Sequence, residues 1–149
     1  MVNTNEGRRQ VWMLKENRVC GKSNGNLDMT AISVFYDAGV NPLRKTATLK
    51  AVQHWMMQSH LPDEFLFLEL GFDGVFTFTQ ADFPEQIHYI RIDGTERNKY
   101  LFQKEHLWNI AAKMATYEKL MFIDSDVAPI DDQDWFRKVY RALDKCLFT

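Results

Sequence analysis

The stretch that decides the fold lies in the second half of the chain and reads Lys119-Leu120-Met121-Phe122-Ile123-Asp124-Ser125-Asp126-Val127-Ala128-Pro129. A short apolar run that ends abruptly in two carboxylates is typical of a buried strand that delivers an acidic pair to the edge of a sheet. The pair alone is weak evidence, because 12 Asp among 149 residues give about one Asp-x-Asp by chance. The residues around the pair therefore decide its meaning.

Length and composition indicate one folded domain. The 149 residues can bury one core of ordinary size, and 46% hydrophobic with 26% charged residues is typical of a folded, soluble protein. The formal charge of −2 gives no reason to expect a nucleic-acid partner. Apolar runs such as 65–68 are too short for a transmembrane segment. Cys20 and Cys146 lack any metal-site spacing, which favours a reduced, cytoplasmic chain and leaves a disulfide between them open.

Residues 1–30 are expected to form an N-terminal extension of uncertain order, and residues 31–149 an α/β domain. From Ile32 onward, strands are predicted at 32–37, 64–70, 87–92 and 119–124. The second strand is almost continuously apolar, as in a parallel sheet covered on both faces. Residues 74–79 alternate apolar and polar, which predicts either a short edge strand or an ordered loop.

Three helices are predicted from apolar residues that recur three and four positions apart and give each helix one face against a sheet. These residues are Leu49, Val52, Trp55 and Met56 in the first helix, Leu107, Ile110, Ala111 and Met114 in a helix at about 104–116, and Trp135, Phe136, Val139, Tyr140 and Leu143 in the last. His106, Asn109 and Lys113 fall on the opposite side of the second helix. The acidic run 131–134 is expected to form the cap and first turn of the last helix.

This order of elements predicts an α/β fold with a mainly parallel, Rossmann-like sheet flanked by helices. Ligands of such sheets bind outside the carboxyl ends of the strands. The predicted ends carry acidic or aromatic residues, namely Tyr36, Asp37, Glu69, Asp93, Asp124 and Asp126.

Asp124 and Asp126 have two interpretations. Two carboxylates one residue apart can share a divalent cation, Mg²⁺ or Mn²⁺, which would bridge phosphate oxygens and act as a Lewis acid for a departing diphosphate. Alternatively, the pair caps a turn before Pro129 and the last helix. The spacing alone does not separate the two interpretations. An EF-hand is excluded, because Pro129 and Trp135 stand where that loop needs Gly and Glu.

From Ile32 onward the chain resembles the nucleotide-diphospho-sugar glycosyltransferases of the GT-A fold, in their nucleotide-binding half. Three segments in one order carry the resemblance: Lys-Glu-His-Leu-Trp-Asn at 104–109, Leu-Met-Phe-Ile-Asp-Ser-Asp-Val at 120–127 and Asp-Trp-Phe at 134–136. Asn109 stands 15 positions before Asp124, a spacing that many members of the family share. Residues 67–72 are similar to the family's second strand, where an acidic residue meets the base or ribose.

The resemblance implies roles for residues at the nucleoside end. Tyr36 and Asp37 would border the nucleobase, with Tyr36 as a stacking surface, and Glu69 would accept hydrogen bonds from the base or ribose. The alternatives from the residues themselves are a half-buried aromatic side chain for Tyr36 and a solvated strand end for Glu69.

The resemblance also implies roles around the diphosphate. Asp126 would ligate the cation, and Asp124 would hold the ribose or a metal-bound water. Lys104 would approach the diphosphate, against the alternative of a solvated helix lysine. Asn109 would orient the loop by hydrogen bonds.

The chain departs from the family because a full transferase continues with an acceptor-binding half that supplies a general base, and no credible base occurs in these residues. We therefore expect a transferase fragment or truncation that binds a nucleotide-diphospho-sugar donor for an unknown acceptor. One alternative is a nucleotidyltransferase, although only Gly39 stands where its Gly-rich loop belongs. The other is a catalytically incomplete interaction or sugar-nucleotide-binding protein, with self-association through an uncovered sheet edge.

Overall fold

The computed structural model describes residues 27–37, 41–94 and 104–145. They form, in chain order, β1 (Leu27–Tyr36), α2 (Pro42–Met56), β2 (Pro62–Phe72), the short 3₁₀ helix η1 (Gln80–Asp82), β3 (Ile87–Gly94), α4 (Lys104–Met114), β4 (Lys119–Asp124) and α5 (Trp135–Leu143). The predicted order of strands and helices is confirmed.

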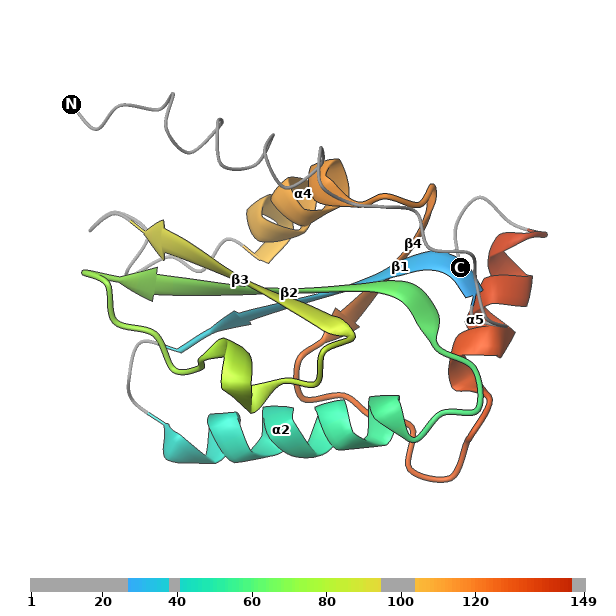
Figure 1. Cartoon of the computed structure of the whole chain (residues 1–149), viewed down its shortest axis with the longest axis horizontal. Coiled ribbons are helices and arrows are strands. Elements are labelled where there is room, and N and C mark those ends of the chain that lie inside the picture. Colours follow the sequence, from blue (N-terminus) through green and yellow to red (C-terminus); the bar gives the residue numbers. More distant parts are fainter. Residues whose placement is uncertain (1–26, 38–40, 95–103, 146–149) are drawn as a thin grey trace.

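The four strands form one parallel sheet in the order β3-β2-β1-β4. From β1 the chain proceeds outward through β2 and β3, and it then returns to place β4 on the other side of β1 (Figure 1). The register sets Asp124 beside Val34 of β1. The predicted α/β fold with a parallel, Rossmann-like sheet is confirmed, and its topological switch point lies between β1 and β4.

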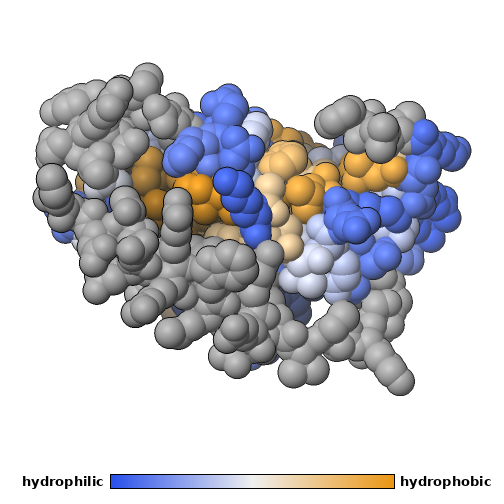
Figure 2. Space-filling view, turned by 90° about the horizontal axis from the view of Figure 1, so that it is seen from above, coloured by the Kyte–Doolittle hydropathy of each residue, from blue (hydrophilic) through white to orange (hydrophobic). Residues whose placement is uncertain are grey.

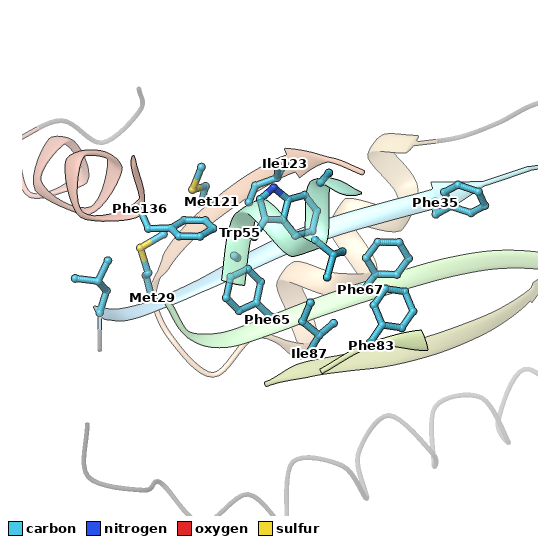
Figure 3. Packing of buried hydrophobic residues seen from close by; sticks show 14 of the residues in the cluster. Met29, Phe35, Trp55, Phe65, Phe67, Phe83, Ile87, Met121, Ile123 and Phe136 are labelled. Atoms are coloured by element: carbon cyan, nitrogen blue, oxygen red, sulfur yellow. The ribbon is translucent and has the colours of Figure 1, made fainter. Parts of the chain in front are cut away.

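Helices cover both faces of the sheet (Figure 1). On one face, α2, α5 and the β2–β3 connection bury a largely aromatic cluster, in which the rings of Trp55 and Phe65 stack at 6.4 Å and Phe136 meets Phe65 edge-on (Figure 3). On the other face, α4 packs Leu107, Ala111 and Met114 against β1 and β2. The apolar helix faces that the sequence predicts are therefore the faces that pack on the sheet.

Several predicted boundaries are wrong. β1 begins at Leu27, so residues 27–30 belong to the sheet rather than to an extension, and residues 1–26 lie outside the described part of the chain. β2 continues through Gly71 to Phe72. Of the two alternatives predicted for residues 74–79, the ordered loop is confirmed. The acidic run precedes α5: Asp134 occupies the N-cap position without a capping bond from its side chain, while Asp132 Oδ1 accepts from Asp134 N.

β4 has the predicted bounds, but it is not buried on both faces. It is an edge strand of the described sheet, with Met121 and Ile123 buried while Phe122 and Asp124 are exposed. No helix within residues 27–37, 41–94 and 104–145 has the length and apolarity that a membrane crossing requires. Cys20 and Cys146 lie outside the described residues.

Candidate functional site

The acidic pair lies at the carboxyl end of β4, beside the end of β1. Asp124 is the last residue of the strand, and a turn follows that is closed by the bond from Val127 N to Asp124 O at 3.1 Å. Ser125 is buried, whereas Asp124 and Asp126 on either side of it are exposed. The turn therefore presents both carboxylates to solvent at the switch point, which is where open α/β sheets bind ligands.

Buried residues in the last turn of α2 and just after it hold this turn and the loop that follows. Trp55 Nε1 donates to the carbonyl of Val127 at 2.8 Å. The Gln58 side chain, only 8% exposed, donates to Asp132 O at 2.7 Å and accepts from Trp135 N at 2.8 Å. The loop is thus fixed at both ends. Sequence reasoning missed this role of Trp55 and Gln58, since periodicity marks Trp55 only as a core residue and gives Gln58 no signal.

Lys104 is the one predicted diphosphate contact that the structure brings to the acidic pair. It is the first residue of α4, and its Nζ forms an ion pair with Asp124 Oδ1. The same ammonium lies 4.4 Å from the centroid of the Trp108 ring, a favourable cation–π arrangement. One cation of the chain itself is therefore already on the first carboxylate of the pair.

The end of β1 adds a second basic group. Arg44 Nη1 donates to the carbonyl of Tyr36 at 2.5 Å, and its guanidinium lies 5.2 Å from the centroid of the Phe35 ring. Arg44 belongs to the first turn of α2, which begins with Pro42 and is capped by Asn41 Oδ1 accepting from Leu43 N. The positive end of the α2 dipole and one arginine thus lie at the end of β1. Sequence reasoning missed Arg44, although a capping Asn-Pro followed by basic residues was visible.

Tyr36 and Asp37 stand at the carboxyl end of β1, as predicted, and both are partly exposed. The Tyr36 ring meets the Phe72 ring edge-on with 5.6 Å between centroids. The ring is therefore a half-buried strand-end aromatic, and its role as a stacking surface for a base stays a prediction.

Glu69 does not stand at a strand end. It lies inside β2, 1% exposed, and its carboxylate accepts from the backbone N–H groups of Thr77 and Phe78 and from the Tyr89 hydroxyl. The expectation of a solvated strand end is wrong, because the β2–β3 connection folds over this position. Burial, and then the hydrogen bond to Glu69, raise the pKa of Tyr89 well above its ordinary value. Glu69 thus anchors the connection from within.

Asn109 lies on the exposed face of α4 with His106 and Lys113, opposite the residues that pack on the sheet, as predicted. Within the described part of the chain it makes no hydrogen bond to the loop after β4. Its proposed orienting role stays a prediction.

The two carboxylates at the turn fit a cation whose other ligands come from a bound phosphate compound and water. Among residues 27–37, 41–94 and 104–145, no group of three or more His, Cys, Asp or Glu gathers as a metal centre. Mg²⁺ commonly binds one or two carboxylates and completes its shell with phosphate oxygens and water. Capping fits the pair less well, because within these ranges neither carboxylate accepts a backbone N–H and the N-cap of α5 is Asp134.

Comparisons with protein-family models, with curated proteins and with solved structures return no match for this chain. The likeness to the GT-A glycosyltransferases therefore rests on the three segments quoted above.

Proposed function

We propose that this chain is a transferase-type module that binds a nucleotide-diphospho-sugar through Mn²⁺ or Mg²⁺ held by Asp124 and Asp126. The observation that supports it most is the position of two exposed carboxylates at the switch point between β1 and β4. The cation would neutralise the diphosphate and stabilise it as a leaving group when a sugar is transferred.

The neighbouring residues fit a diphosphate in charge. Lys104 and Arg44 supply positive charge at the ends of β4 and β1, and the N-terminus of α2 adds its dipole. Tyr36 and Asp37 would border the nucleoside. Glu69 is left out of the site, since its carboxylate is buried and bonded within the protein. We propose a cytoplasmic location for the protein.

Thermal melting with a panel of nucleoside diphosphates tests the proposal. We expect the melting temperature to rise only when a nucleotide and Mn²⁺ or Mg²⁺ are both present. Asp126→Ala should abolish that rise, because it removes the assigned metal ligand. Asp131→Ala is the matched control, an exposed carboxylate in the same loop that is outside the proposed site. A rise without metal, or none with any nucleotide, would contradict the proposal.

A second proposal, an interaction protein that self-associates, is favoured by the edge strand. Phe122 on β4 is 44% exposed, with its ring 5.2 Å from that of Trp108. The face seen from the α4 side shows apolar surface among polar side chains (Figure 2). Exposed apolar surface on a sheet edge invites pairing with another chain. Gel filtration should then give a dimer that Phe122→Ser converts to monomer, and a monomeric wild-type chain would argue against it.

A further inference from the structure

The ammonium of Lys104 forms an ion pair with Asp124, one of the two carboxylates that the proposed function assigns to the divalent cation. Its side chain is 28% exposed and that of Asp124 48%, so the pair lies at the surface rather than in the core. The ring of Trp108, one turn along α4, supports the ammonium from a second side. The lysine is thus directed at the end of β4 by its own helix.

We propose that Lys104 is a built-in counter-ion that competes with the divalent cation for Asp124 and weakens its binding until a diphosphate binds. This inference rests on the proposed function. The ammonium of Lys104 already offsets the negative charge of Asp124 and would repel a divalent ion on the same carboxylate, so the lysine and the cation would compete for Asp124. A lysine suits such an exchange, because its ammonium is a point charge on a flexible stem and binds phosphate readily.

The consequence is a coupling between the two ligands. Without diphosphate, Lys104 competes with the cation and weakens its binding. With diphosphate, the ammonium gains phosphate oxygens as new partners, and Asp124 becomes available. Each ligand therefore strengthens the binding of the other by the same factor, as linkage requires. Metal alone binds weakly, and metal with nucleotide binds well.

The competing explanation is a fixed ion pair that merely fastens the start of α4 to β4. The two explanations predict different effects of removing Lys104 on the affinity for metal alone. If Lys104 competes with the cation, its removal tightens the binding of metal alone. If the pair is only a fastening, removal lowers stability slightly, by the small amount typical of surface ion pairs, and leaves metal affinity unchanged or weaker.

The experiment titrates Mn²⁺ into the full chain and follows free Mn²⁺ by electron paramagnetic resonance, with and without a saturating nucleoside diphosphate. Lys104→Met, which keeps the stem and removes the charge, should bind Mn²⁺ alone about fivefold to tenfold more tightly than the wild type. The factor by which nucleotide strengthens Mn²⁺ binding should fall by a similar amount. Lys104→Gln serves as a second charge-free variant, and Lys104→Arg should keep the wild-type affinity.

Lys113→Met is the matched control, a lysine on the exposed face of the same helix. Folding of each variant is checked by circular dichroism and melting temperature. If wild-type chain binds Mn²⁺ and nucleotide cooperatively but both charge-free variants bind Mn²⁺ no more tightly, this inference alone is overturned. If the wild type shows no metal-dependent nucleotide binding, the proposed function and the inference fall together.

Discussion

Replacing Glu69 tests whether this residue stabilises the fold or binds a ligand. Its carboxylate lies inside β2 and accepts from the N–H groups of Thr77 and Phe78 and from the Tyr89 hydroxyl. Glu69→Ala leaves two backbone donors without an acceptor. The hydroxyl of Tyr89 keeps a second acceptor, Phe78 O at 2.9 Å. The cost therefore comes mainly from the two amides.

A buried donor left unpaired costs about 1 to 3 kcal/mol, so the two amides together give about 4 kcal/mol. That is a large part of the roughly 5 to 15 kcal/mol by which a domain is stable. With a urea slope of about 2 kcal/mol per M, the unfolding midpoint should fall by about 2 M. Glu69→Gln keeps one carbonyl oxygen as acceptor and should lose about half as much.

Urea denaturation followed by circular dichroism measures both shifts, and nucleotide titration of the folded variants measures binding. We expect the free energy of unfolding to fall steeply, while any Mn²⁺-dependent nucleotide affinity of folded Glu69→Gln stays close to wild type. A loss below about 1 kcal/mol for Glu69→Ala would refute the reasoning. Loss of nucleotide binding at unchanged stability would instead restore the base or ribose contact that the resemblance implies.

Two further predictions concern Tyr89 and Trp55. Folding raises the pKa of Tyr89 above its ordinary value of 10.0, so the protonated hydroxyl stabilises the fold below pH 10 and this contribution is lost as the pH rises further. In strong base, the urea midpoint of Tyr89→Phe should therefore fall less steeply with pH than the midpoint of the wild type. Trp55→Phe removes the donor to Val127 O, and melting should show a loss of about 1 to 2 kcal/mol of stability. Titration should show that Mn²⁺-dependent nucleotide binding is severalfold weaker. Phe83→Leu, if equally destabilised, should leave nucleotide binding unchanged.

The fold followed from patterns that extend over a few neighbouring residues. The apolar run before Asp124 predicted β4 with the bounds that it has, and three-and-four spacing identified the buried faces of α2 and α4. The start of β1 was missed because Asp28 and Thr30 interrupt its apolar pattern. Thr30 is nevertheless fully buried, since its hydroxyl donates to Glu64 at 2.7 Å. That partner is 34 positions away, beyond the reach of any local pattern.

Contacts between residues far apart in sequence also explain why only part of the site could be predicted. Exposed carboxylates after an apolar strand are visible in the sequence, and so is the lysine that opens α4. The contacts that fix the turn and its loop are not visible in the sequence, because the side chain of Gln58 donates to the backbone of Asp132, 74 positions away. Glu69 was misread for a related reason: its acidic side chain suggested a strand end, but a connection several residues later supplies the donors that allow its burial.

The fixed backbone of the turn and its small number of carboxylate ligands both affect how tightly the turn would bind a metal ion. Under the proposed function, two carboxylates that are exposed to water would hold a divalent cation weakly, and the ammonium of Lys104 would weaken that binding further while it remains on Asp124. The remaining ligands of the cation would then come from the bound molecule, and a diphosphate would supply both oxygens for the cation and negative charge for the lysine. Trp55 and Gln58 fix the backbone of the turn and its loop before any ligand arrives, so little ordering cost remains to be met on binding. A fixed turn with too few ligands is thus suited to recognising a metal–diphosphate pair rather than either component alone.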